Sequence, residues 1–512
     1  MKNILFSFLV LLFLTFSAIA QQALPADIVF NIKREAFHNS QIDELAFFLT
    51  DFAGPRLAAS RLAERAEIWS KEKFEAMGFS NARIERAADF PRGGWDNLKT
   101  YVAMTQPYYV NFAASPKAWT GSTDGLVSGE VILLNIRTPE DIENYRGKLG
   151  GKIIIMPETS RYTMQFTPFA TRHTDERLQE LATDPRPTGA SNQLRAQVAT
   201  TGVNLQQQIR NLLRDEQPAV LISGGGSFNV PRTMSVSHRY GDAEPIAELV
   251  LPIEEHGRVV RLINRNVPVS MEVEIKNEFY DNQHINNVIA EIPGSDPRLR
   301  DEVVLIGAHL DSWHGGTGAA DNASGCVVMI EAMRIIQAIG IKPRRTIRIA
   351  LWGGEELGLI GSRGYMQDFL YDVDANRIRR GYEQFAVYLN MDNGSGKFRG
   401  IYLEENDMAF PFLHEWIKPL ETIGFGVLSP RKTGGTDHVT FDRIGLPAFQ
   451  FIQDDLEYMR GYHTVMDTYE RLIITDLQYN AAIVAVLALS AAMDNAKIPP
   501  KPLPEGFTMQ RR

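Results

Sequence analysis

The spacing of apolar and polar positions divides the chain into three parts. In the first part, residues 27–50 and 59–77 carry apolar side chains at helical spacing, and residues 81–90 predict a strand. From about residue 122, short β-rich runs such as GEVILLNI and AVLISGGG alternate with Gly, Pro and Asp turns, which predicts a compact β-rich module. Residues 158–217 inside this module are polar, with Gln-rich helical pieces, and we expect them to form an excursion on the surface.

Apolar strands alternate with helical runs in the third part, from about residue 283. The segments VVLIGAHLD, TIRIALWGG and AVYLNMDNG predict strands, and the run after Gly325 predicts a helix. This alternation is typical of an α/β fold with a mostly parallel sheet sandwiched by helices. The predicted division is a peptide leader at 1–20, an α/β domain made of 21–121 and 283–497, an inserted β-rich domain at 122–282, and a Pro-rich tail at 498–512.

The first twenty residues have the pattern of a secretory signal. Lys2 precedes an apolar run, and Ala18-Ile19-Ala20 precedes Gln21 as a small-residue cleavage site. A membrane anchor is the alternative, but the run is shorter than the roughly 20 residues that a spanning helix needs. We expect cleavage after Ala20, an exported protein that is periplasmic or secreted, and no stable membrane anchor after cleavage.

Composition narrows the classes of partner. The chain has 512 residues, 44% of them hydrophobic, and its net charge of −9 is spread without long like-charge runs. We therefore expect neither nucleic acid nor anionic lipid as a partner. The single cysteine, Cys326, excludes an intrachain disulfide, and its apolar surroundings indicate a packing role.

Candidate metal ligands and acid–base groups gather just past the predicted strands. His309 and Asp311 end one strand, Asp321 follows in a turn rich in Gly, Ala and Asn, and Glu355 and Glu356 end the next strand. In open α/β sheets this edge is where sites form. Because His309 and Asp311 are two residues apart in an extended segment, we expect Asp311 to accept a hydrogen bond from the imidazole and to fix its tautomer.

Each of these residues also has an ordinary structural explanation. Asp321 could cap the helix that follows it, Asp392 could form the turn with Asn393, and His463 could be a satisfied surface histidine. His309 could lie at a strand edge beside a solvated aspartate. Together, however, they supply imidazoles and carboxylates at successive strand ends, which these separate explanations account for poorly.

The adjacent pair Glu355 and Glu356 gives the sharpest signal. Two neighbouring carboxylates repel unless a cation or a proton intervenes, and a metal site can bind one and leave the other as a base. The charges of Asp321, Glu356, Asp392 and a hydroxide would balance two divalent ions, which favours a two-metal site. Mixed imidazole and carboxylate ligands suit zinc, although Mn²⁺ or Co²⁺ could also bind them.

The ordered motifs H-x-D, D-N-A-S-G, G-G-E-E-x-G-x-x-G-S, N-M-D and Y-H-T…D-T-Y-E resemble the co-catalytic zinc exopeptidases. This family includes bacterial leucyl aminopeptidases, glutamate carboxypeptidase and carboxypeptidase Q. The resemblance runs through residues 286–492 and implies a phosphorylase/hydrolase-like fold. The segments YRGKLGGKIIIM and AVLISGGG resemble the protease-associated domain inserted in some members, and the opening LTDFAGPRLAAS resembles carboxypeptidase Q-like members.

Carried over residue by residue, the resemblance implies two Zn²⁺ ions per chain and a role for each matched residue. The implied roles are His309, Asp321 and Asp392 as ligands of one zinc; Asp321, Glu356 and His463 as ligands of the other; Glu355 as general base; Asp311 as the group that orients His309; Tyr462 as oxyanion support; and Thr436, Asp437 and His438 as substrate-facing residues.

Two departures from the family pattern bear on this assignment. Asn322 stands where several members have a second Asp, at a bond that is often cis in the family, and the sequence leaves its state open. No Arg or Lys occurs between Leu446 and Met459, where glutamate carboxypeptidase has arginines that hold a glutamate side chain. We therefore do not expect glutamate specificity.

The predicted function is hydrolysis of terminal peptide bonds of short peptides or dipeptides, by an aminopeptidase or by a carboxypeptidase Q-like dipeptidase. Two alternatives stay open: a glutaminyl-cyclase-like acyltransferase with one zinc, and a catalytically inactive receptor-like binding protein on the same scaffold. The expected partners are peptide substrates, and a homodimer is left open.

Overall fold

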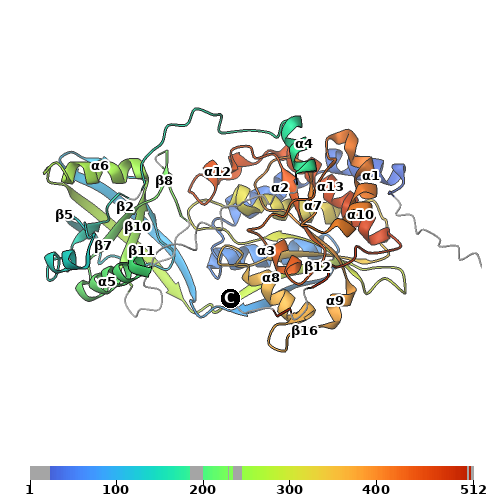
Figure 1. Ribbon diagram of the computed structural model, residues 1–512, viewed down its shortest axis with the longest axis horizontal. Coiled ribbons are helices and arrows are strands. Elements are labelled where there is room, and N and C mark those ends of the chain that lie inside the picture. The colour runs from blue at the N-terminus through green and yellow to red at the C-terminus, as the bar shows by residue number, and fades with distance from the viewer. Residues whose placement is uncertain are drawn as a thin grey trace, which may run out of the picture.

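Two sheets of eight strands each organise the part of the chain that the structure describes. The computed structural model describes residues 23–158, 160–184, 200–228, 230–233, 245–503 and 507–508. Figure 1 shows the sheets in two lobes that the long strands β2 and β11 connect. The predicted signal segment, residues 1–20, and part of the predicted Pro-rich tail lie outside the described residues.

The first sheet has the order β1-β12-β14-β13-β17-β20-β18-β19. Its strands are β1 (Ser80–Asp89), β12 (His284–Ile292), β13 (Val303–His309), β14 (Thr346–Trp352), β17 (Phe385–Asn390), β18 (Phe398–Tyr402), β19 (Val427–Ser429) and β20 (Ala448–Gln453). The central strands β14, β13, β17 and β20 pair in parallel, while β1, β12 and β18 join the sheet in antiparallel fashion. The predicted α/β fold with a mostly parallel sheet is confirmed.

Side chains of the central strands alternate between two apolar layers. Val304 and Ile306 of β13 pack on one side of the sheet, whereas Leu305 packs on the other. Such strands are apolar throughout because both faces of the sheet are covered. The helices are α1 (Ala26–His38), α2 (Ile42–Phe47), α3 (Arg61–Ala76), α7 (Ser324–Ala338), α8 (Ile360–Tyr365), α9 (Arg380–Gln384), α10 (Phe410–Ile417), α11 (His438–Asp442), α12 (Tyr458–Gly461) and α13 (Ile474–Met493).

Helix α13 is long and apolar enough to cross a membrane by length and composition. Most of it is buried inside the protein, where it packs against α7 and β13. The helix is therefore part of the core between α1, α7 and the first sheet.

The second sheet has the order β3-β2-β11-β5-β6-β7-β10-β4. Its strands are β2 (Gly94–Gln106), β3 (Val110–Asn111), β4 (Ser115–Pro116), β5 (Val127–Leu133), β6 (Ile153–Ile155), β7 (Val220–Gly224), β10 (Ala247–Leu251) and β11 (Ser270–Tyr280), with helices α5 (Thr200–Glu216) and α6 (Ile253–Ile263). A β-rich unit was expected in residues 122–282, but the sheet also takes in β2, β3 and β4, which precede residue 122.

One segment of the predicted surface excursion crosses between the lobes. Helix α4 (Asp175–Thr183) lies on the first lobe, and Leu178 and Leu181 pack with Ile452 of β20. In Figure 1 an extended trace leads from the second lobe to α4. The excursion is thus a link between the lobes. Two short strand pairs are also present, β8 (Gly226–Ser227) with β9 (Val230–Pro231) and β15 (Tyr371–Asp372) with β16 (Arg377–Ile378), and isolated bridges join Thr171 to Leu456 and Arg232 to Thr464.

Candidate metal centre

The ends of three adjacent parallel strands bring the predicted ligands together. β13 ends at His309, β14 ends at Trp352 just before Glu355 and Glu356, and β17 ends at Asn390 just before Asp392. Because these strands are neighbours and run in the same direction, their carboxyl ends lie at one edge of the sheet.

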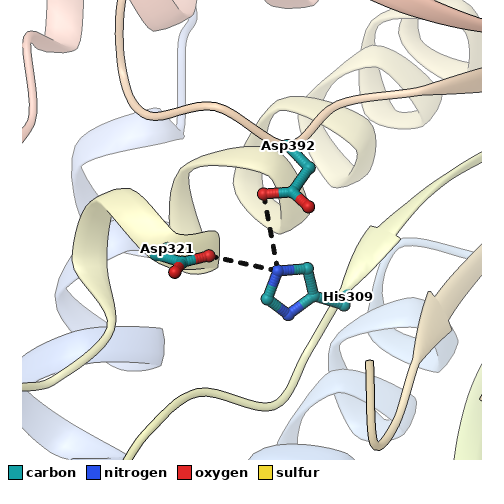
Figure 2. A group of neighbouring side chains, drawn as sticks. All are labelled: His309, Asp321 and Asp392. Carbon is teal, nitrogen blue, oxygen red and sulfur yellow. Dashed lines mark ion pairs between the residues drawn. The ribbon is translucent and has the colours of Figure 1, made fainter. Parts of the chain in front are cut away.

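His309, Asp321 and Asp392 form the first potential ligand group. Figure 2 shows the imidazole of His309 between the two carboxylates. Its Nε2 lies 3.2 Å from Oδ1 of Asp321 and 3.5 Å from Oδ1 of Asp392. The three residues are buried, and their ligand atoms lie within 4.8 Å of one another.

Asp321, Glu356 and His463 form the second potential ligand group. Nε2 of His463 lies 3.0 Å from Oδ2 of Asp321 and 2.9 Å from Oε2 of Glu356. Asp321 therefore offers Oδ1 to one group and Oδ2 to the other. All five predicted ligands are brought together, in the two sets that the sequence predicted.

The nitrogen and oxygen atoms of the two ligand groups are placed to bind cations and not to hydrogen-bond one another. Nε2 of His309, Oδ2 of Asp321 and Oε1 of Glu356 are buried without a well-formed hydrogen bond to any described residue. Such orphaned polar atoms are costly unless something satisfies them. Imidazole and carboxylate donors in groups of three suit zinc, so the residues fit this metal.

The pKa values of the ligand residues are shifted by burial and by the negative charge of the neighbouring carboxylates. Burial would raise the pKa of Asp321, but the rings of His309 and His463 hold it well below its usual range. Burial raises the pKa of Glu356 to about 8, and the charge of Asp321 adds to this. Burial would lower the pKa of His463, but the nearby carboxylates of Asp321 and Glu356 raise it to about 9. Bound cations can take the place of these protons.

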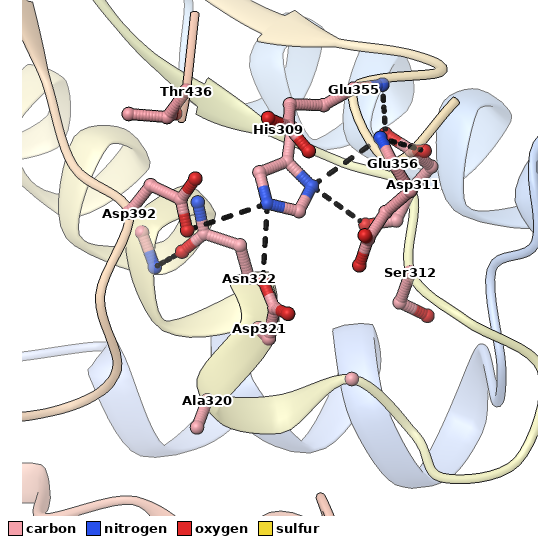
Figure 3. A network of polar contacts seen from close by, with 12 residues as sticks. His309, Asp311, Ser312, Ala320, Asp321, Asn322, Glu355, Glu356, Asp392 and Thr436 are labelled. Carbon is pink, nitrogen blue, oxygen red and sulfur yellow. Dashed lines mark hydrogen bonds and ion pairs between the residues drawn. The ribbon is translucent and has the colours of Figure 1, made fainter. Parts of the chain in front are cut away.

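Asp311 positions other site residues through two of its groups, its backbone oxygen and its carboxylate (Figure 3). Its backbone oxygen lies 2.9 Å from Nδ1 of His309, whereas its carboxylate lies 3.6 Å away. The expected imidazole–carboxylate hydrogen bond is thus replaced by one to the carbonyl. The carboxylate instead accepts hydrogen bonds from the backbone N–H groups of Glu355 and Glu356, at 3.0 and 3.3 Å. Asp311 therefore fixes the ring and the Glu–Glu turn together.

Three further residues support the ligands, and none of them was predicted to belong to the site. Nε1 of Trp313 donates to Oε2 of Glu356 at 2.8 Å. The carboxylate of Asp467, within the D-T-Y-E motif, accepts hydrogen bonds from the backbone N–H groups of Ala320 and Asp321 at 2.7 and 3.0 Å. Only the position of Asp467 in a motif could have signalled its role.

The third supporting residue is Arg56, whose guanidinium is fully buried. It donates to the backbone oxygens of Leu310, Thr317 and Gly318 at 2.6, 2.5 and 2.8 Å. These carbonyls belong to the loop between His309 and Asp321, so Arg56 holds that loop in place.

Glu355 lies beside the ligands without belonging to either group. Burial raises its pKa well above the usual range, and the charges of Asp392, Asp437 and Glu356 add to this. The peptide bond between Asp321 and Asn322 is cis, a point on which the sequence alone made no prediction.

The other predicted site residues are close by. The ring of Tyr462 stacks on that of His463, with centroids 3.5 Å apart. Thr436, Asp437 and His438 are buried. Oγ1 of Thr436 accepts a hydrogen bond from Asn390 at 3.0 Å, and burial raises the pKa of Asp437 to about 7. His438 faces Glu404, 3.5 Å from its carboxylate. Contact of these three residues with substrate stays a prediction.

An α/β sheet with two carboxylate-bridged ligand groups at its carboxyl edge defines a metal-dependent hydrolase. Residues 287–488 match the family model described as peptidase family M28. This confirms the prediction of a zinc metallopeptidase from the exopeptidase family.

Similar proteins extend the likeness beyond the matched segment. The chain is 24% identical to carboxypeptidase Q of Mus musculus over 466 residues, which cover 90% of this chain and 88% of that protein. A peptidase M28 precursor from Shewanella amazonensis has a similar structure, with a TM-score of 0.67, 24% identity, and coverage of 94% of this chain and 99% of that one. A zinc aminopeptidase from Bacillus subtilis has a TM-score of 0.56 at 19% identity, covering 90% and 97%. The two solved structures support the fold, including both lobes.

Proposed function

We propose that the chain is a dinuclear zinc exopeptidase that hydrolyses the terminal peptide bond of short peptides or dipeptides. The observation that carries the proposal is the position of Asp321, whose two oxygens lie 3.2 Å from His309 and 3.0 Å from His463. One carboxylate shared by two ligand groups is the arrangement that two neighbouring ions need. In this proposal His309 and Asp392 complete one zinc site, and Glu356 and His463 complete the other.

The residues around the ligand groups supply the proton transfers. When bound, a zinc pair polarises the substrate carbonyl and acidifies the attacking water. Glu355, whose backbone N–H is held by the carboxylate of Asp311 beside the ligands, takes the proton of that water and passes it to the leaving amine. Tyr462, held against His463, donates a hydrogen bond to the oxygen that becomes negative. Asp311 holds the ring of His309 and the backbone of Glu355 in place through its hydrogen bonds to both.

The end of the substrate that the enzyme recognises is open to a direct test. Zinc-loaded protein is assayed with a free dipeptide, an N-blocked peptide and a C-blocked peptide. Hydrolysis that requires both free ends would identify a dipeptidase, and hydrolysis of the N-blocked peptide would identify a carboxypeptidase. Hydrolysis of the C-blocked peptide at an undiminished rate would instead identify an aminopeptidase. Hydrolysis of none of the three would remove the proposal.

Two other functions fit parts of the same site. A glutaminyl-cyclase-like acyltransferase would need one zinc, and an inactive binding protein would be expected to have lost ligands. The presence of both complete ligand groups argues against each. We also propose export of the protein, supported by the signal pattern before Gln21, and sequencing the N-terminus of the exported protein tests this. The oligomeric state, with a homodimer as one outcome, is measured by light scattering.

A further inference from the structure

One loop of the first lobe carries both Tyr462 and His463. We call residues 454–464 the His463 loop; it follows β20 and contains α12, which Figure 1 shows on the side of the first lobe that faces the second. Leu456 and His463 of this loop have left-handed backbone conformations, with φ of 47° and 55°. Residues other than glycine adopt this conformation at a cost and keep it only where the surrounding structure holds them. The loop therefore depends on contacts at these two positions.

Segments that extend from the second lobe make a backbone contact at each of the two positions. Thr171 and Leu456 form an isolated bridge and exchange hydrogen bonds of 3.1 and 2.7 Å. The backbone N–H of Thr233 donates to the backbone oxygen of His463 at 2.8 Å, beside a second isolated bridge between Arg232 and Thr464. The second lobe thus binds the His463 loop near both of its ends.

Buried carboxylates anchor the first of these segments. We call residues 160–174 the strap. Arg172 of the strap lies 2.8 Å from Asp454 and 2.7 Å from Asp476, and the backbone N–H of His173 donates to Asp454 at 3.0 Å. Both carboxylates are buried. Charged hydrogen bonds to buried groups are stronger than those of exposed pairs, so the strap is fixed to the first residue of the His463 loop.

The second segment is held by close packing. Thr233 is buried, and a β-carbon added at Gly315 would lie only 2.1 Å from its Cγ2. Gly315 belongs to the loop between His309 and Asp321, so Thr233 fits between that loop and the His463 loop. The guanidinium of Arg232 lies 5.9 Å from the ring centre of Tyr462, within the range of a cation–π contact. This segment therefore contacts His463 by its backbone and Tyr462 by a side chain.

The residues that belong to the first ligand group alone are held from within the first lobe. Nδ1 of His309 lies 2.9 Å from the backbone oxygen of Asp311, and the backbone oxygen of Asp392 accepts a hydrogen bond from Gln450 at 2.6 Å. Gln450 lies in β20 of the first sheet. The strap and the bond from Thr233 therefore bear on the second ligand group more directly than on the first.

We propose that the second lobe positions His463 and Tyr462, and that it thereby sets the affinity of the second ligand group for its zinc ion. The zinc part of this inference rests on the proposed two-zinc function and adds to it a role for the inserted lobe. Release of the strap would free Leu456 and let the His463 loop leave its left-handed conformations. Zinc binding and attachment of the lobe are then linked, so each should stabilise the other.

The first test uses metal-free full-length protein and needs no turnover. Hydrogen–deuterium exchange is measured in peptides covering residues 455–463 and, for comparison, β13. Arg172→Ala should speed exchange in the His463 loop about tenfold or more and leave β13 unchanged. Asp454 keeps Arg399 at 3.1 Å in this variant, so its buried charge stays paired. Arg161→Ala is the matched control, because Arg161 lies in the same strap with a side chain that is 88% exposed.

The second test measures zinc binding by the same proteins without substrate. Arg172→Ala should weaken one of the two zinc-binding steps about tenfold or more and leave the other unchanged, whereas Arg161→Ala should leave both unchanged. A general loss of structure would not separate the two steps in this way. In the wild-type protein, which needs no variant to fold, binding of two zinc ions should slow exchange of the amides of Thr171 and Thr233.

The two tests separate this inference from the function on which it rests. If the wild-type protein binds no second zinc ion, but exchange in the His463 loop speeds up in Arg172→Ala and not in Arg161→Ala, the two-zinc function fails and the positioning of the loop stands. Unchanged exchange of the loop in Arg172→Ala would overturn the inference. Equal weakening of both zinc steps, weakening of neither, or unchanged exchange at Thr171 and Thr233 after two ions bind would also overturn it.

Discussion

Trp313→Phe removes a single hydrogen-bond donor from one of the two ligand groups. Nε1 of Trp313 donates to Oε2 of Glu356 at 2.8 Å, and the ring lies 6.0 Å from that of His463. Phenylalanine retains most of the ring packing and loses only the N–H. A hydrogen bond to a charged group is worth about 1.5–3 kcal/mol, which corresponds to about a 10- to 100-fold change in a binding constant. Loss of a group that orients a metal ligand has a similar effect.

We therefore expect one of the two zinc-binding steps to weaken about 10- to 100-fold and the other to keep its affinity. The assay is a zinc titration of metal-free protein against a chromophoric chelator, fitted as two steps. Trp95→Phe is the matched control, since Trp95 is also buried in the same cluster but its N–H bonds the backbone oxygen of Thr120 at 3.0 Å. Equal weakening of both steps, or no change in either, would refute the reasoning.

Three further predictions concern other groups. Glu355→Gln should keep the zinc content of the wild-type protein, measured by mass spectrometry, and lower kcat about 10²- to 10⁴-fold; wild-type turnover would exclude Glu355 as the base. Burial raises the pKa of Glu67 to about 7 from 4.5, so the unfolded chain loses this proton first and the group's contribution to stability falls as pH rises from 4.5 to 7. In urea unfolding, the free energy of unfolding of Glu67→Gln relative to wild type should therefore rise by up to about 3 kcal/mol over this pH range. A difference between the two proteins that does not change with pH would contradict this prediction. Arg56→Lys leaves buried carbonyls unpaired, so it should lower the free energy of unfolding by about 3 kcal/mol or more in the same assay. The control Arg61→Lys, at an exposed position, should lower it by under about 1 kcal/mol. Equal losses in the two variants would argue against the role of Arg56 in holding the loop.

The sequence predicted the first sheet because its signals are local. The apolar runs at Val303–His309 and Thr346–Trp352 are long and bounded by turns, and a strand covered on both faces needs such a run. The ligands could be predicted for a related reason: they follow the strands directly, so the fold alone places them at one edge. His463 and Asp392 were added by motif, and both lie where the motif implies.

Contacts between distant segments could not be predicted in this way. Arg56 has no apolar periodicity, and the carbonyls that it binds in the ligand loop, those of Leu310, Thr317 and Gly318, are more than 250 residues away, a separation for which a sequence carries no pattern. Residues 158–217 were expected to form a surface excursion because they are polar, yet one of their polar groups, Arg172, binds two buried carboxylates of the first lobe. The carbonyl of Asp311 replaced its carboxylate at His309 because β13 ends at His309, so strand alternation does not extend to Asp311.

Zinc stoichiometry measured alongside activity tests the central claim most directly. Metal-free protein is equilibrated with rising zinc, and bound zinc per chain and dipeptide hydrolysis are measured on the same samples. The shared carboxylate of Asp321 predicts two zinc ions per chain at saturation, with full activity only when both are bound. Saturation at one zinc per chain with full activity would contradict the dinuclear account.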